Sequence, residues 1–258
     1  MIYETYTLPE TKVTVTAYLT NNDSVEPGRK RPLVLLCPGG GYLLRVPNEG
    51  EPIALRLLSY GIQTVIVNYS VKPAVWPTAL NELAEAAAFA RSHAEEWYAD
   101  PDKIAVMGFS AGGHEAASLA TLWQTLKWGE QCKPNALILG YAVLTSGEFR
   151  HNNSFLRLLG DRYDELLDSV SLEKLVTKDC PPTFLWHTWE DELVPVENSL
   201  LFAQALRRNG ISCEMHLYAH GRHGSGLSNR ETWKGEDKRL IPANEGWIDL
   251  AARWLNEL

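Results

Sequence analysis

The pentapeptide Gly-Phe-Ser-Ala-Gly at residues 108–112 constrains the fold of this chain more than any other feature. The apolar run before it, Lys103–Met107, has the length of a short buried strand, and His114–Ala120 after it predicts a helix. At a sharp turn from a strand into a helix, a serine hydroxyl is exposed, and glycines two residues to either side remove side chains that would clash. The context predicts a nucleophile at Ser110; the alternative is a glycine-rich turn with a capping serine.

A second glycine-rich loop follows another candidate strand. The apolar run Pro32–Leu36 leads into Cys-Pro-Gly-Gly-Gly-Tyr at residues 37–42. Three consecutive glycines let backbone N–H groups turn toward a substrate carbonyl, and the N–H of Ala111, next to the nucleophile, supplies a further donor. Losing one such oxyanion donor typically costs roughly 3–4 kcal/mol of barrier. The loop is therefore a candidate oxyanion hole, with an ordinary flexible turn as the alternative.

Three acidic residues compete for the role of the acid that orients the catalytic base. The candidate strand Thr183–His187 is followed by Glu190, Asp191 and Glu192. Asp191 is favoured because it lies after the strand has ended and its short side chain holds an imidazole rigidly. The alternative is that these acids interact with the positive end of the following helix, Val196–Arg208.

The last candidate strand, Cys213–Tyr218, precedes two histidines that could act as the base. His223 is favoured because Gly221 and Gly224 flank it and would let its ring swing over the nucleophile. His220 is expected to shape the loop. The other histidines have no second feature that supports such a role: His93, His114, His151, His187 and His216.

The order of these candidates along the chain is informative in itself. Ser110, Asp191 and His223 each follow a candidate strand, and they occur in the order that the α/β-hydrolase fold imposes on its nucleophile, acid and base. Three independent candidates in this order are much harder to obtain by chance than the pentapeptide. This agreement between the chain order and the candidate strands is the basis for predicting a serine hydrolase.

Four segments of the chain resemble α/β-hydrolase esterases near the hormone-sensitive-lipase and acetylxylan-esterase-like branches: Pro38–Tyr42, Gly108–His114, Glu190–Pro195 and His220–Gly224. The resemblance extends from about Lys30 to the C-terminus. It implies a catalytic triad and oxyanion donors, formed by Ser110, His223 and Asp191 with Gly40 or Gly41 and Ala111.

Two departures separate the chain from the lipase-like group. Pro38 stands where many lipase-like relatives have the histidine of a His-Gly-Gly-Gly loop, and Phe109 replaces the aspartate common beside the nucleophile. Both departures favour the carbohydrate-esterase-like branch over a long-chain lipase. That branch acts on small acyl groups, often acetyl, carried by sugars or xylo-oligosaccharides. The resemblance thus implies a serine carboxylesterase for short acyl esters.

Strands and helices alternate along the chain, which predicts one α/β-hydrolase domain over residues 1–258 with a mostly parallel sheet and helices on both faces. Thr11–Leu19 has the alternation of an edge strand. Residues 145–179 break the pattern and predict a small lid insertion over the site. The expected substrate contacts are Tyr42, Trp76 and Trp189.

Composition limits the other functions. A net charge of −8 argues against a nucleic-acid partner, and the four cysteines form neither a C-x-x-C pair nor a zinc-spaced cluster. The expected partner is a small-molecule ester, with no metal or organic cofactor; oligomeric state is left open. With no signal-peptide pattern at the N-terminus and no apolar run near the ~20 residues that span a bilayer, the expectation is a cytoplasmic protein without a membrane partner.

Three alternatives share the same residues. A small amidase or formamidase would use the same triad. A peptidase of the prolyl-oligopeptidase type would too, although the chain has no room for a propeller domain. A hydrolase fold retained as a catalytically inert binding module is the alternative from another class.

Overall fold

One eight-stranded sheet forms the centre of the protein. The computed structural model describes the backbone of residues 1–258 and every side chain except that of Lys238. Along the sheet the strands lie in the order β1 (Ile2–Thr7), β2 (Thr14–Leu19), β4 (Gln63–Val67), β3 (Arg31–Cys37), β5 (Ala99–Phe109), β6 (Ala136–Gly140), β7 (Thr183–Thr188) and β8 (Cys213–Tyr218). β2 runs antiparallel to β1 and β4, and β4, β3, β5, β6, β7 and β8 run parallel to one another.

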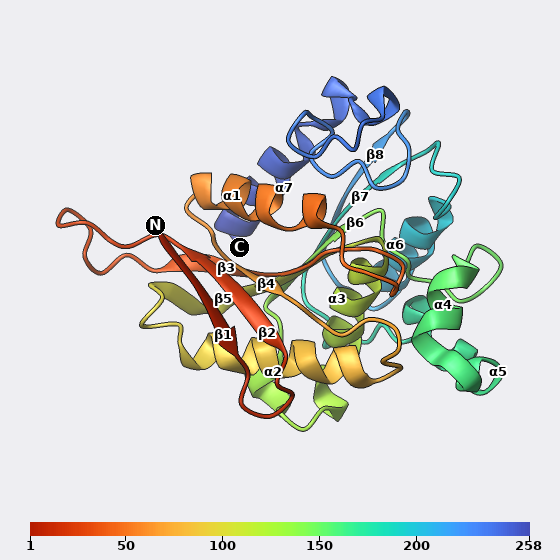
Figure 1. Cartoon of the computed structure of the whole chain (residues 1–258), viewed down its shortest axis with the longest axis horizontal. Helices are drawn as coiled ribbons and strands as arrows, with labels where there is room; N and C mark the ends of the chain where they lie inside the picture. The colour runs from red at the N-terminus through yellow and green to blue at the C-terminus, as the bar shows by residue number, and fades with distance from the viewer.

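Helices cover both faces of this sheet (Figure 1). On one face lie α1 (Glu51–Ser59) and α7 (Trp247–Glu257). On the other lie α2 (Thr78–Ser92), α3 (Ser110–Leu122) and α6 (Glu197–Arg208). The predicted α/β-hydrolase architecture is therefore confirmed.

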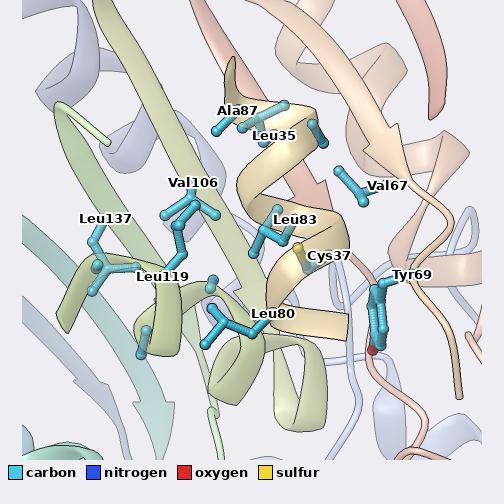
Figure 2. Close-up of a cluster of buried hydrophobic side chains, with 14 of the residues drawn as sticks. Leu35, Cys37, Val67, Tyr69, Leu80, Leu83, Ala87, Val106, Leu119 and Leu137 are labelled. Atoms are coloured by element: carbon cyan, nitrogen blue, oxygen red, sulfur yellow. The ribbon is translucent and has the colours of Figure 1, made fainter. Parts of the chain in front are cut away.

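The central strand β3 shows how the sequence places the two cores. Its seven residues are all buried, and alternate side chains belong to opposite sides. Leu33, Leu35 and Cys37 pack toward α2 and α3, whereas Val34 and Leu36 pack toward α1 and α7. Strand side chains alternate between faces, so a continuous apolar run is required where both faces are covered. Figure 2 shows the α2 side of this core.

The position of β2 differs from the expectation of an edge strand. β2 is hydrogen-bonded on both sides, and the edge is formed by β1, whose residues are mostly exposed. The alternation in Thr14–Leu19 arises because threonine side chains on a half-covered strand are only partly buried, which an inner strand near the end of a sheet also allows.

The segment at residues 145–179 lies between β6 and β7 and contains α4 (Asn152–Leu159) and α5 (Tyr163–Leu166). Phe155 and Leu158 of α4 are buried in the core beside α3. The apolar stripe of α4 thus holds this segment on the body of the protein. Its role as a lid stays a prediction.

We expect Leu35→Ala to lower the free energy of unfolding by about 2–5 kcal/mol, because it empties a fully buried position between β3 and α2. Urea denaturation measures the change. Leu43→Ala, at a half-exposed leucine in a loop, should change stability by less than about 0.5 kcal/mol. Equal losses at the two sites would contradict the assigned core.

Candidate active site

Ser110 occupies the turn between the longest strand, β5, and the helix α3. Its backbone is in the left-handed region, with φ of +53°, and it is the first residue of the helix. A non-glycine residue there stores roughly 1–3 kcal/mol of strain, which the surrounding packing must hold in place. The turn lies at the carboxyl end of the sheet, where parallel α/β folds place their ligand sites.

The two glycines of the pentapeptide are required by close backbone contacts. A Cβ on Gly108 would lie 2.1 Å from the carbonyl oxygen of Gly112. A Cβ on Gly112 would lie 2.1 Å from the carbonyl oxygen of Cys37, at the end of β3. These distances are far below van der Waals contact, so only glycine lets the serine turn sit this tightly against β3.

Three polar side chains from separate loops form a hydrogen-bonded line. His223 Nε2 lies 2.8 Å from Ser110 Oγ, and His223 Nδ1 lies 2.7 Å from Asp191 Oδ2. Asp191 follows β7 and His223 follows β8. The structure thus brings together the serine, acid and histidine that the sequence favoured.

The Asp191 carboxylate is buried and held by its own loop. Its Oδ1 accepts hydrogen bonds from the N–H groups of Leu193 and Val194, at 3.0 and 2.9 Å. Burial by itself raises the pKa of Asp191, but hydrogen bonds from His187, His223 and the Val194 N–H outweigh it and hold the pKa well below the usual range. The carboxylate is therefore ionised at neutral pH and can orient the His223 imidazole.

The glycine loop after β3 lies directly beside Ser110. A Cβ on Gly39 would be 2.9 Å from Ser110 Cβ. The Gly39 carbonyl accepts the N–H of Val46, and the Gly40 carbonyl accepts the N–H of Leu43. Because the N–H of a trans peptide points opposite to its carbonyl, these bonds fix the direction of the next two N–H groups.

Those two N–H groups, of Gly40 and Gly41, have no acceptor within the part of the protein that the structure describes. Ala111 is the second residue of α3, where an N–H has no intrahelical partner. Gly40 and Gly41 also line a pocket that contains Ser110 and His223. Donors predicted from the sequence are thus available at the pocket wall.

This pocket has a volume of about 750 Å³ and a mostly polar and charged wall. Val46 and Leu193 are the apolar side chains larger than glycine among its described lining residues. His151 and Arg157 reach it from the 145–179 segment, and the Arg157 guanidinium donates to the Gly41 carbonyl at 3.0 Å. The wall therefore suits a polar ligand.

The three residues expected to contact substrate do not line this pocket. Tyr42 is buried, and its hydroxyl lies 2.8 Å from His114 Nδ1 inside the core. Trp76 packs against the core near His114, and Trp189 has 63% of its surface exposed on the loop after β7. Proximity to a strand end did not determine where these rings point.

Two of the other candidates for base and acid, His220 and Glu190, pair with each other. His220 Nδ1 lies 2.8 Å from Glu190 Oε1 in an exposed contact. Glu192 lines the pocket without touching His223. These placements agree with the preference for His223 and Asp191.

His187 has no feature in the sequence that predicts a role in the site. It is fully buried at the end of β7, with Nε2 at 2.9 Å from the Val194 carbonyl and 3.3 Å from Asp191 Oδ2. Both of these atoms accept hydrogen bonds, so Nε2 carries the proton and Nδ1 accepts from Ser199 at 2.8 Å. His187 therefore braces the loop that presents Asp191.

A second buried group lies behind the serine helix. The Tyr42 hydroxyl is 2.8 Å from His114 Nδ1 and 3.0 Å from Glu115 Oε2. His114 Nε2 faces the Val170 carbonyl, so its proton is on Nε2 and Nδ1 is an acceptor. The single hydroxyl proton of Tyr42 cannot be donated to both His114 and Glu115. Tyr42 therefore donates to His114 Nδ1, and a protonated Glu115 donates to the Tyr42 oxygen. Burial raises the pKa of Glu115 to about 8 and lowers that of His114 to about 4, which agrees with both groups being neutral.

Within the described side chains, no group of three or more histidine, cysteine or acidic residues is arranged to hold a metal ion. Among the helices that the structure describes, none combines the length and the hydropathy of a membrane span. The cytoplasmic location expected from the sequence stays a prediction.

The fold and the arrangement at the strand ends define an α/β-hydrolase. The BD-FAE family model matches residues 23–206, and the chain belongs to that family. An acetylxylan esterase of Xylanibacter ruminicola is 28% identical over 82% of this chain. The chain spans less than half the length of the first curated relatives that it matches, 44% in the case of that esterase.

Two solved structures match nearly the whole chain. An acetyl ester-xyloside bifunctional hydrolase from Caldicellulosiruptor lactoaceticus is 35% identical, with a TM-score of 0.84 over 95% of this chain and 88% of that one. The carboxylesterase Cest-2923 from Lactobacillus plantarum is 30% identical, with a TM-score of 0.88 over 100% of this chain and 98% of that one. Both of these proteins are named as ester hydrolases.

We expect Glu115→Gln to change how stability depends on pH. The folded protein keeps the Glu115 proton up to about pH 8, whereas an unfolded glutamate loses it near 4.5. The stability from this group is thus fully present below that lower pKa and is lost as pH rises through the upper one. Glutamine also donates to Tyr42 but does not titrate. Between these two pKa values, the free energy of unfolding of the variant therefore rises relative to that of the wild type by up to about 1.4 kcal/mol per pH unit.

Urea denaturation of both proteins at about pH 5, 6.5 and 8 measures this difference. Glu95→Gln, at an exposed glutamate, is the control and should give the same difference at each pH. A constant difference for Glu115→Gln as well would show that Glu115 is ionised throughout.

Proposed function

We propose that the protein is a serine carboxylesterase that hydrolyses short acyl esters through an acyl-enzyme on Ser110. The hydrogen-bonded line from Asp191 through His223 to Ser110, at the wall of a polar pocket, carries this proposal. The esterase relatives and the family membership support the same reaction type.

In the first half of the reaction, His223 Nε2 takes the Ser110 proton while Oγ attacks the ester carbonyl carbon. The resulting oxyanion would accept hydrogen bonds from the Ala111 N–H and from Gly40 or Gly41, whose N–H groups have no described protein acceptor. His223 then gives the proton to the departing alcohol oxygen, and the acyl group stays on Oγ.

In the second half, water attacks the acyl-enzyme and His223 takes the water proton. Collapse of the second tetrahedral intermediate returns the proton to Ser110 Oγ and releases the carboxylic acid. Asp191 keeps the Nδ1 proton of His223 facing it and stabilises the imidazolium in both halves. This mechanism requires no cofactor.

We extend the proposal to acetyl esters of sugars or xylo-oligosaccharides. Few apolar side chains line the pocket to hold a long acyl chain, since Val46 and Leu193 are the larger ones among the residues described. Charged and amide side chains line the rest, which suits the hydroxyl groups of a carbohydrate alcohol. The names of the acetylxylan esterase and acetyl ester-xyloside hydrolase relatives point the same way. The 145–179 segment would close over the alcohol as a lid within a single-domain protein.

Ser110→Ala and His223→Ala should each lower kcat for p-nitrophenyl acetate by at least about 10³-fold, because each removes a group that acts in every turnover. Asp191→Asn should lower it by up to about 10⁴-fold by favouring the wrong imidazole tautomer. A fluorophosphonate probe should add its mass to the wild type and leave Ser110→Ala unmodified. His220→Ala, at the exposed histidine beside Glu190, should retain normal turnover. A folded wild type that the probe does not label would instead indicate an inert binding module.

The acyl preference is tested by comparing kcat/KM for p-nitrophenyl acetate and octanoate. We expect acetate to exceed octanoate by about tenfold or more, because the pocket gives a long chain few apolar contacts. Release of acetate from acetylated xylo-oligosaccharides, followed by chromatography, tests the alcohol. A preference for octanoate would contradict the short-acyl assignment.

A further inference from the structure

Glu49 is a buried carboxylate at the pocket that the mechanism above does not use. It ends the short 3₁₀ helix η1 (Pro47–Glu49), between the glycine loop and α1, and only 1% of its surface is exposed. It nevertheless belongs to the lining of the Ser110 pocket. An acidic side chain is rarely buried to this degree unless its oxygens have partners.

Both carboxylate oxygens have such partners, and they come from different loops. Oε2 accepts the N–H of Gly39 at 2.8 Å, and Oε1 accepts the hydroxyl of Tyr141 at 2.8 Å. The Tyr141 hydroxyl in turn accepts the N–H of Gly226 at 3.0 Å. Gly39 lies in the glycine loop after β3, the proposed oxyanion loop, and Tyr141 follows β6. Gly226 lies in the loop after β8 that contains His223, the histidine loop.

Two further contacts tie this chain of bonds to His223. The Tyr141 ring packs edge-on against the His223 ring, with centroids 5.0 Å apart. A Cβ on Gly224, the next residue after His223, would lie 3.7 Å from Glu49 Oε1. Tyr141 therefore touches the histidine loop directly as well as through the Gly226 N–H, and Glu49 lies next to that loop.

We propose that Glu49 is a positioning residue that couples the oxyanion loop to the histidine loop through Tyr141. The inference rests on the proposed function, since it assigns Glu49 to the alignment of oxyanion donors with the Ser110 and His223 pair. With both loops held by one carboxylate, the donors and the base keep their relative position when the tetrahedral intermediate forms.

The chemistry of the contact requires a carboxylate. Both partners of Glu49 donate, and a carboxylate accepts at each oxygen. A glutamine of the same shape has one accepting oxygen and one donating NH₂ group, so either Gly39 or Tyr141 loses its acceptor. Shortening the side chain to aspartate would withdraw the carboxylate from both. The glutamine substitution thus breaks the link while leaving the volume of the site almost unaltered.

We expect Glu49→Gln to lower kcat for p-nitrophenyl acetate by roughly 10- to 100-fold with little change in KM, because misplaced donors weaken transition-state binding more than substrate binding. Tyr141→Phe removes the hydroxyl that joins Glu49 to Gly226, leaves the bond between Glu49 and Gly39, and should lower kcat several-fold. The affinity for 1,1,1-trifluoroacetone, whose adduct with a serine resembles the tetrahedral intermediate, should fall by the same factor as kcat/KM in each variant.

Glu85→Gln is the matched control. Glu85 is also buried and accepts two backbone N–H groups, of Glu10 and Thr11 at 2.7 Å, far from the site. It should lower Tm without changing kcat or the affinity for trifluoroacetone. This control separates loss of a buried carboxylate from loss of alignment.

The inference is overturned if folded Glu49→Gln keeps wild-type kcat, or if its kcat falls while trifluoroacetone still binds as in the wild type. Should Glu49→Gln not fold, Tyr141→Phe decides alone, and unchanged kcat and trifluoroacetone affinity in that variant overturn the inference. A wild type that the fluorophosphonate probe does not label refutes the proposed function itself, before any variant is compared.

Discussion

The contact between the first turn of α3 and the end of β3 is the constraint on which the rest of the site depends. Gly112 lies so close to the Cys37 carbonyl that a Cβ cannot fit between them. This approach puts the glycine loop after β3 beside Ser110, because that loop leaves the sheet where the helix crosses it. The left-handed backbone of Ser110 is tolerated for the same reason: β5 on one side and the packed helix on the other hold both ends of the turn. The proposed nucleophile and the proposed oxyanion donors are therefore positioned by one packing contact.

Burial alone does not decide the charge of the acidic groups around this contact. Asp191 and Glu115 are both removed from water, which by itself raises the pKa of each. Asp191 receives hydrogen bonds from two imidazoles and from peptide N–H groups, and it stays ionised. Glu115 has a single tyrosine oxygen as its partner, and it stays protonated. The number of donors aimed at a carboxyl group separates an orienting carboxylate from a neutral structural acid.

The sequence predicted the parts of the site that local rules control. The serine turn, the glycine loop and the strands before Asp191 and His223 follow from short-range pattern and glycine placement. The antiparallel edge strand β1 was missed because its mostly exposed residues show no apolar stripe. His187 and Glu49 were missed for another reason: each acts through atoms that are distant in the chain, such as Ser199 or Tyr141. Tyr42, expected to contact substrate, instead turns its hydroxyl into the core toward α3.

The residues of the site come from two parts of the fold, the strand ends of the sheet and the α4 region. Ser110, Asp191 and His223 lie beyond the carboxyl ends of the parallel strands β5, β7 and β8, so the sheet sets their spacing. His151 and Arg157 come instead from the α4 region, which lies outside the sheet. Arg157 nonetheless donates to the Gly41 carbonyl, which joins this segment to the oxyanion loop. A change at Arg157 that alters the pocket wall would therefore also reach the glycine loop, so these two parts of the site are coupled at this position.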